Sequence, residues 1–208
     1  SLWNVYTDKI EFKSSIGNTD FDVIALFDNH VVIIEIKHLV TPYDPKRYYE
    51  DRQEIKKAIK QLKLRKQVLL RDWALIRDIT KGFLPPEPYQ EERMIQLVCT
   101  NIDSFTSLEI DGIRIVDESV LIRFFSDNGQ YVKIWSGPKI YKKEKIWENS
   151  QPTIDDFKRY IASPTAVKWY REVVKRKNLT IPRYGEGDYL GTVNYILDED
   201  IVKFDRQI

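Results

Sequence analysis

The chain has 208 residues, 42% of them hydrophobic and 31% charged, with a formal net charge of +1. This composition is typical of a globular protein with one large domain, or one domain and a small appendage, and no apolar run is long enough to cross a bilayer. The single cysteine, Cys99, excludes an internal disulfide and has apolar neighbours that predict a buried thiol; without a signal-peptide pattern, we expect a cytoplasmic protein with no membrane partner.

Turn-forming residues separate three early apolar segments, which predicts three strands. The strands cover residues 3–12, 21–27 and 31–38, and the turns lie at residues 14–18 and 28–30. Because only a short break separates the last two segments, these two strands are expected to form a β-hairpin.

Three charged residues flank the apolar runs of this hairpin. Asp22 precedes the first run, and Glu35 and Lys37 follow the second. Side chains alternate along a strand, so Glu35 and Lys37 share a face, and the hairpin can bring Asp22 beside them. Carboxylates and an amine are costly to place at the end of buried strands, which indicates a functional site. Carboxylate oxygens suit Mg²⁺ or Mn²⁺, and such a metal polarises phosphate groups.

A long helix is predicted after a proline-containing loop. Asp44 is a good N-cap, and Pro45 fits the first helical turn. Apolar residues then recur at spacings of three, four and seven from Ile55 to Ile76, which predicts one helix face packed on a sheet. The helix is expected to run to about Asp78 or to break once on the way.

Shorter elements are predicted for the rest of the chain, and they complete an α/β fold with an α/β/α core and a mixed central sheet. They are strands at 94–100 and 113–116, a helix at 119–125 capped by Asp117, strands or an extended arm within 131–147, a helix from 153 to 161, a helix opened by Ser163–Pro164 that contains 168–178, and a strand at 189–197. We expect the core to cover residues 1–126 and an α+β extension to cover residues 127–208.

Asp22, a gap of about a dozen residues and then Glu35-Ile36-Lys37 form a pattern that resembles the PD-(D/E)xK nuclease superfamily. That superfamily includes restriction endonucleases, Holliday-junction resolvases, RecB-type nucleases and nuclease-related domains. The resemblance implies a restriction-endonuclease-like core and a Mg²⁺- or Mn²⁺-dependent nuclease, with DNA as the expected substrate. It also implies Asp22, Glu35 and the Ile36 carbonyl as metal ligands and Lys37 as the catalytic lysine. The proline of the family name is absent, because Phe21 precedes Asp22.

Several residues near this motif have open roles. Asp20, two residues before Asp22, is the rival for the first metal ligand, and Glu11 is the one nearby residue that can stand in for the acidic residue of the family's N-terminal helix. Gln61 resembles a glutamine that reaches into the active site in several subfamilies, although Arg65 stands where RecB-type nucleases have a tyrosine. The alternative for Gln61 is an ordinary position on an amphipathic helix.

Two functions are consistent with the motif. The first is a metal-dependent nuclease, acting alone, as a homodimer or as a domain of a longer restriction, repair or defence protein. The alternative is a catalytically inactive nuclease fold that serves as a nucleic-acid-binding or assembly module. Because unpaired buried carboxylates cost stability, replacing Asp22 or Glu35 is expected to leave the fold intact or even more stable.

Basic residues are concentrated in two segments of this nearly neutral chain. Residues 46–77 contain eleven Lys or Arg against four Asp or Glu, and residues 158–177 contain seven against one. Such segments fit a surface that faces phosphates, although solvated helix faces show the same composition. Lys46 and Arg47 follow the motif most closely in sequence, so we expect them to contact nucleic acid.

Overall fold

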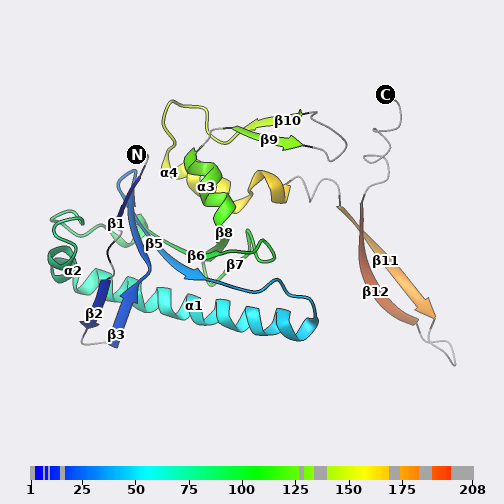
Figure 1. Ribbon diagram of the computed structural model, residues 1–208, viewed down its shortest axis with the longest axis horizontal. Helices are drawn as coiled ribbons and strands as arrows, with labels where there is room; N and C mark the ends of the chain where they lie inside the picture. Colours follow the sequence, from blue (N-terminus) through cyan, green and yellow to red (C-terminus); the bar gives the residue numbers. More distant parts are fainter. Residues whose placement is uncertain are drawn as a thin grey trace. The chain divides into compact units, whose positions relative to one another are not determined.

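A six-stranded mixed sheet forms the centre of the structure, which is a computed structural model (Figure 1). The description covers residues 3–6, 8, 10–14, 17–126, 129–133, 140–168, 174–182 and 189–197. In sheet order, the strands are β1 (Asn4–Tyr6), β4 (Val23–Phe27), β5 (His30–Lys37), β6 (Met94–Thr100), β8 (Ile113–Asp117) and β7 (Glu109–Ile110). The strands β5, β6 and β8 run parallel to one another, and the remaining pairs are antiparallel. The expected mixed α/β fold is therefore confirmed.

Helices cover both faces of this sheet (Figure 1). Helix α1 (Pro45–Arg71) lies on one face, where Val31 and Ile33 pack in the same cluster as its Leu62. Helices α3 (Glu118–Ser126) and α4 (Ile154–Ala162) lie on the other face, where Phe124 and Phe157 pack together with the alternate side chains of β5. The apolar run of β5 at residues 31–34 is continuous, and because successive side chains point to opposite faces, both faces of the strand carry a helical layer.

The ends of α1 follow from local sequence. The Asp44 carboxylate accepts a hydrogen bond from the Arg47 N–H at 2.7 Å, and Pro45 begins the helix, as predicted. The helix breaks once, at Asp72, and α2 (Trp73–Ile79) continues after the break.

The expected strand at residues 3–12 is two strands. After β1, the chain forms β2 (Ile10–Ser14), which pairs with β3 (Gly17–Phe21) in a separate antiparallel hairpin. The prediction of one strand over 3–12 was wrong, and the pairing strand β3 was not expected because its residues, GNTDF, are mostly polar and show little apolar alternation. This extra hairpin is important for the site, since it carries Asp20.

The turn between β4 and β5 is of the tight type that suits hairpins. Asp28 and Asn29 have φ angles of 44° and 56°, which only glycine, asparagine and aspartate adopt readily, and Phe27 pairs with His30 across the turn. The Asp28 carboxylate also accepts a hydrogen bond from the N–H of Ile154 at 2.8 Å. The turn is therefore attached to the first residue of α4.

The compact unit that contains the sheet extends to Ser163, beyond the expected end of the core at residue 126. It includes β9 (Gly129–Lys133), β10 (Ile140–Lys145) and α4, which opens with a capping box between Thr153 and Asp156. Helix α4 belongs to this unit because Phe157 packs against Phe124, with ring centroids 5.0 Å apart.

The second unit, Pro164–Ile208, contains a β-hairpin of β11 (Val174–Pro182) and β12 (Tyr189–Leu197). The strand at 189–197 was predicted, but the helix over 168–178 is wrong: residues 165–168 are helical, 169–173 lie outside the described residues, and β11 begins at Val174. The segment 174–182 is a strand because it pairs with β12, and its β-branched residues, such as Val174 and Ile181, suit a strand. None of the described helices is long and apolar enough to span a membrane.

Candidate metal and phosphodiester site

Asp22, Glu35 and Lys37 lie on the same face of the sheet, the face covered by α1. Val31 and Ile33 belong to the cluster on that face, and Glu35 and Lys37 follow them at steps of two along β5. Ile24 belongs to the same cluster, and Asp22 precedes it by two residues. The convergence predicted from the hairpin is therefore present.

The β4–β5 register brings the two acidic residues into neighbouring positions. Val23 pairs with Ile34 at the start of β4. One step further in this register, Asp22 comes opposite Glu35, where Cβ atoms of cross-strand neighbours are about 5 Å apart. The Asp22 Oδ2 atom accepts a hydrogen bond from the Ile36 N–H at 2.8 Å, which fixes this carboxylate against the end of β5.

Glu35 is buried and lies between two cations. Its relative exposure is 2%, and its Oε1 atom forms an ion pair with Lys37 Nζ at 2.7 Å. Its Oε2 atom forms an ion pair with Arg65 Nη1. A buried carboxylate needs such partners, because desolvation of an isolated charge is very unfavourable. Both oxygens of the central acidic residue are thus held by basic groups of the chain itself.

Arg65 is the residue of this site that sequence reasoning did not assign to it. Its relative exposure is also 2%, and its Nη2 atom lies 2.8 Å from Asp20 Oδ1 and 3.9 Å from Asp22 Oδ1. A signal was present in the sequence: Arg65 lies three residues after Leu62 and four before Leu69, within the apolar face of α1. A charged residue on a buried helix face needs a buried partner, and the carboxylates of the motif were available.

Asp20 and Asp22 both lie at the site, so their positions do not decide which of them is the first metal ligand. Asp20 is more exposed and accepts a hydrogen bond from Arg65, while Asp22 is held by the backbone of β5. Glu11 lies opposite Asp20 in the β2–β3 register. The extra hairpin therefore adds acidic residues to the edge of the cluster.

Gln61, Lys46 and Arg47 are not part of the cluster. Gln61 is exposed on α1, one turn before Arg65. Arg47 forms ion pairs with Asp51 at 3.0 Å and Glu50 at 3.8 Å, and Lys46 is exposed. Arg47 precedes Arg65 by 18 residues of helix, which corresponds to about 27 Å along the axis. Lys46 and Arg47 are therefore far from Arg65 along the helix, and their expected contact with nucleic acid stays a prediction.

The donor chemistry of the cluster fits a hard divalent cation. Asp20, Asp22 and Glu35 supply carboxylate oxygens, which Mg²⁺ and Mn²⁺ prefer. The Ile36 N–H points to Asp22, and the carbonyl of a strand residue points to the same side as its N–H, so this carbonyl is placed to join them. Within the described part of the chain, no group of three or more His, Cys, Asp or Glu side chains is arranged to hold a metal ion. Lys37 and Arg65 are the groups that contact the Glu35 carboxylate in this structure.

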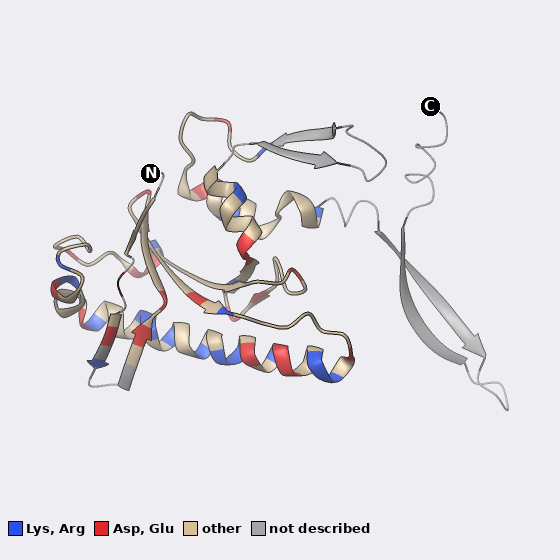
Figure 2. Cartoon of the chain, in the orientation of Figure 1, with Lys and Arg blue, Asp and Glu red and all other residues tan. Residues whose placement is uncertain are grey.

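Acidic and basic residues surround the cluster along α1 (Figure 2). Lys57, two turns before Arg65, forms an ion pair with Glu54 at 2.5 Å. The hydrogen bond from Lys57 lowers the pKa of the Glu54 carboxyl, and the charges of Lys37 and Arg47 act in the same direction. Lys57 is therefore a cation that lies closer to the cluster than Lys46 or Arg47 does.

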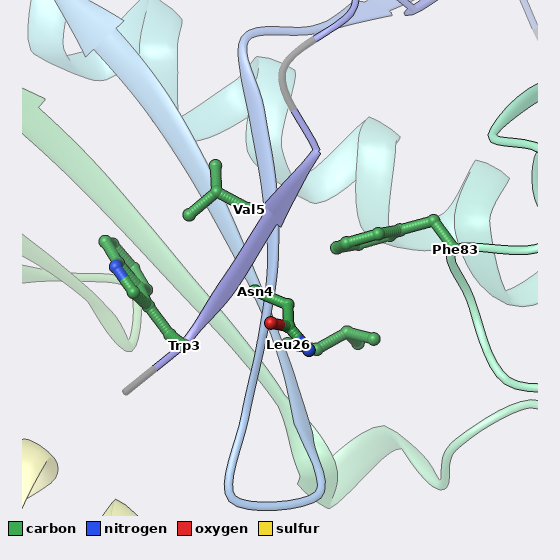
Figure 3. Close-up of a pocket in the computed structure, with 5 residues that line it drawn as sticks. All are labelled: Trp3, Asn4, Val5, Leu26 and Phe83. Atoms are coloured by element: carbon green, nitrogen blue, oxygen red, sulfur yellow. The ribbon is translucent and has the colours of Figure 1, made fainter. Parts of the chain in front are cut away.

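Two hollows and the cysteine lie apart from the Asp22–Glu35–Lys37 cluster. An open hollow of about 530 Å³ is lined by five described residues, none of them charged: Trp3, Asn4, Val5, Leu26 and Phe83 (Figure 3). A polar groove of about 320 Å³ lies at the starts of the parallel strands β6 and β8. Its lining includes two carboxylates, Glu92 and Glu109, and three cations, Lys66, Arg114 and Lys158. Cys99 is buried, as predicted, and burial raises the pKa of its thiol to about 11. A thiol of this kind is a poor nucleophile.

Comparison of the chain with protein-family models, with curated proteins and with solved structures finds no match.

Proposed function

We propose that the chain is a metal-dependent nuclease that hydrolyses phosphodiesters of nucleic acid, with DNA as the expected substrate. The observation that carries the proposal is the convergence of Asp22, Glu35 and Lys37 on one face of the sheet, at the carboxyl end of β5. Acidic groups that share such a site with an amine suit chemistry on a charged phosphate. Mg²⁺ or Mn²⁺, when bound, supplies Lewis-acid polarisation of the phosphodiester.

Each residue has a distinct role in this proposal. Asp22 and Glu35 hold the cation, together with the Ile36 carbonyl, and the backbone hydrogen bond from Ile36 keeps Asp22 in place. Lys37 is side by side with Glu35 and partly exposed, so its ammonium group can stabilise negative charge on the phosphate. Asp20 is the second candidate for the ligand position assigned to Asp22.

The order of the elements around the motif also supports the proposal. The antiparallel β4–β5 hairpin carries the motif, α1 covers it, and β6 then pairs parallel to β5. A restriction-endonuclease-like core, as the sequence resemblance implies, is part of the proposal.

One observation favours the alternative of an inactive nuclease fold used for binding or assembly. The chain's own cations occupy both oxygens of Glu35, and Arg65 links Glu35 to Asp20. An acidic cluster neutralised in this way can persist as a structural element without a metal.

A cleavage panel distinguishes the two functions. Linear and circular DNA and RNA substrates are incubated with the protein in Mg²⁺, in Mn²⁺ and in EDTA, beside the Asp22→Ala and Glu35→Gln variants. The proposal expects cleavage that requires metal and is lost in both variants. Metal-independent cleavage, or equal cleavage by the variants, would reject it. Loss of cleavage in Asp20→Ala with activity in Asp22→Ala would move the ligand role to Asp20.

A further inference from the structure

Arg65 has an unusual position for a basic residue. Its side chain is almost fully buried in the face of α1 that packs on the sheet, among Leu62, Val68 and Leu69. Its guanidinium group contacts two acidic residues at once, Glu35 through Nη1 and Asp20 through Nη2. The planar fork of arginine suits such simultaneous contacts, and a lysine ammonium group cannot reproduce them.

The charges of the cluster nearly balance without a metal. Asp20, Asp22 and Glu35 contribute three negative charges, and Lys37 and Arg65 contribute two positive charges. A divalent cation added to this set leaves one excess positive charge. If the charge of Arg65 is removed, the same cation makes the cluster neutral.

We infer that Arg65 is the internal counter-ion of the metal site and that it competes with the divalent cation for Glu35 and Asp20. The inference rests on the proposed function in one respect only: the carboxylates must be able to bind a divalent cation. Arg65 positions Glu35 and Asp20 before metal enters, and it has to give up part of its contact with them when metal binds. Arg65 therefore lowers the affinity of the site for the cation while it keeps the metal-free protein folded.

The test compares Mn²⁺ binding by the full chain, the Arg65→Met variant and the Lys63→Met variant, measured by isothermal titration calorimetry. Lys63 is on the same helix and pairs with Asp111, away from the cluster, so Lys63→Met removes one positive charge without touching the site. Arg65→Met is expected to bind Mn²⁺ at least tenfold more tightly than the unaltered chain, and Lys63→Met is expected to bind with nearly unchanged affinity. Unchanged or weaker binding by Arg65→Met would overturn the inference.

Thermal unfolding supplies a second readout. In EDTA, Arg65→Met is expected to melt at a lower temperature than the unaltered chain, because Glu35 loses a buried partner. Saturating Mn²⁺ is expected to raise the midpoint of Arg65→Met by more than it raises that of the unaltered chain. An equal shift in both proteins would mean that Arg65 only supports the fold.

A third variant tests competition between Arg65 and the cation if Arg65→Met folds neither in EDTA nor in Mn²⁺. Arg65→Lys keeps the charge but cannot contact Glu35 and Asp20 together, so it is expected to bind Mn²⁺ more tightly than the unaltered chain by a smaller factor. Binding equal to or weaker than that of the unaltered chain would reject competition. Tighter binding by the Arg65 variants in a chain that cleaves no nucleic acid would retain the role of Arg65 and reject the proposed function. The reverse result would reject only the role of Arg65.

Discussion

Replacing Glu35 by glutamine is expected to destabilise the protein strongly, although the sequence alone led to the opposite expectation. Glu35 is not an unpaired buried carboxylate: it is in contact with Lys37 at 2.7 Å and with Arg65. Removing one partner of a buried ion pair costs about 3–5 kcal/mol, because the other charge stays buried. Arg65 keeps Asp20 as a partner and Lys37 is partly hydrated, so we expect about 3 kcal/mol, at the lower end of that range.

Urea unfolding followed by circular dichroism measures this change in the free energy of unfolding. The unfolding midpoint is expected to fall while the m value stays the same, and the melting temperature is expected to fall by roughly 6–12 °C. The matched control is Glu54→Gln, which removes an exposed carboxylate from α1 and is expected to leave the midpoint nearly unchanged. A loss of less than about 1 kcal/mol for Glu35→Gln would refute the ion-pair reasoning.

A double-mutant cycle then isolates the contact between Glu35 and Arg65. Glu35→Gln combined with Arg65→Met removes both charges, so no buried charge is left without its partner. The double variant is expected to be less destabilised than the sum of the single variants, with a coupling energy of about 1–3 kcal/mol. Additive effects would mean that the two side chains do not interact in solution.

Three further predictions concern catalysis, substrate binding and alkaline stability. Lys37→Ala is expected to lower turnover by about 10²–10³-fold with metal binding retained, whereas Asp22→Ala loses both; steady-state cleavage and Mn²⁺ titration separate the two cases. Lys57→Gln is expected to reduce the salt dependence of DNA affinity by about one unit of slope, and the neighbouring variant Lys56→Gln, on the solvent side of α1, is the control; equal slopes would place the phosphates elsewhere. Burial raises the pKa of Cys99 from 9.0 to about 11, so its contribution to stability is complete below pH 9 and is lost as the pH rises to about 11. Between pH 9 and pH 11, the free energy of unfolding of the unaltered chain is expected to fall by about 2–3 kcal/mol more than that of Cys99→Ala.

Features of the fold that depend on neighbouring residues were predictable from the sequence. The N-cap at Asp44 and the strand over 94–100 agree with the structure because capping and apolar runs act within a few residues. The tight turn at residues 28–30 was predicted for the same reason. The pairing of this hairpin also placed Asp22, Glu35 and Lys37 correctly, since side-chain alternation fixes the face of each residue.

Features that depend on distant residues were missed. The role of Arg65 depends on how α1 is rotated over the sheet, which brings it to acidic residues 30 and 45 positions away. The segment at 174–182 is a strand because β12 pairs with it, and nothing within the segment itself indicates that partner. The expected contact of Lys46 and Arg47 with nucleic acid stays a prediction.

The contact between Asp28 and Ile154 has a consequence for the order in which the protein can be completed during synthesis. The turn of the hairpin that carries the acidic residues obtains this hydrogen-bond partner from a residue 126 positions later in the chain. A ribosome-bound chain that ends before α4 therefore contains all of Asp22, Glu35 and Arg65. It leaves the turn without this hydrogen-bond donor and leaves Phe27 without its contact to Phe157 of α4. Such long-range closure slows folding relative to local contacts. The acidic cluster is thus complete in sequence well before the helix that holds the turn of its hairpin has been translated.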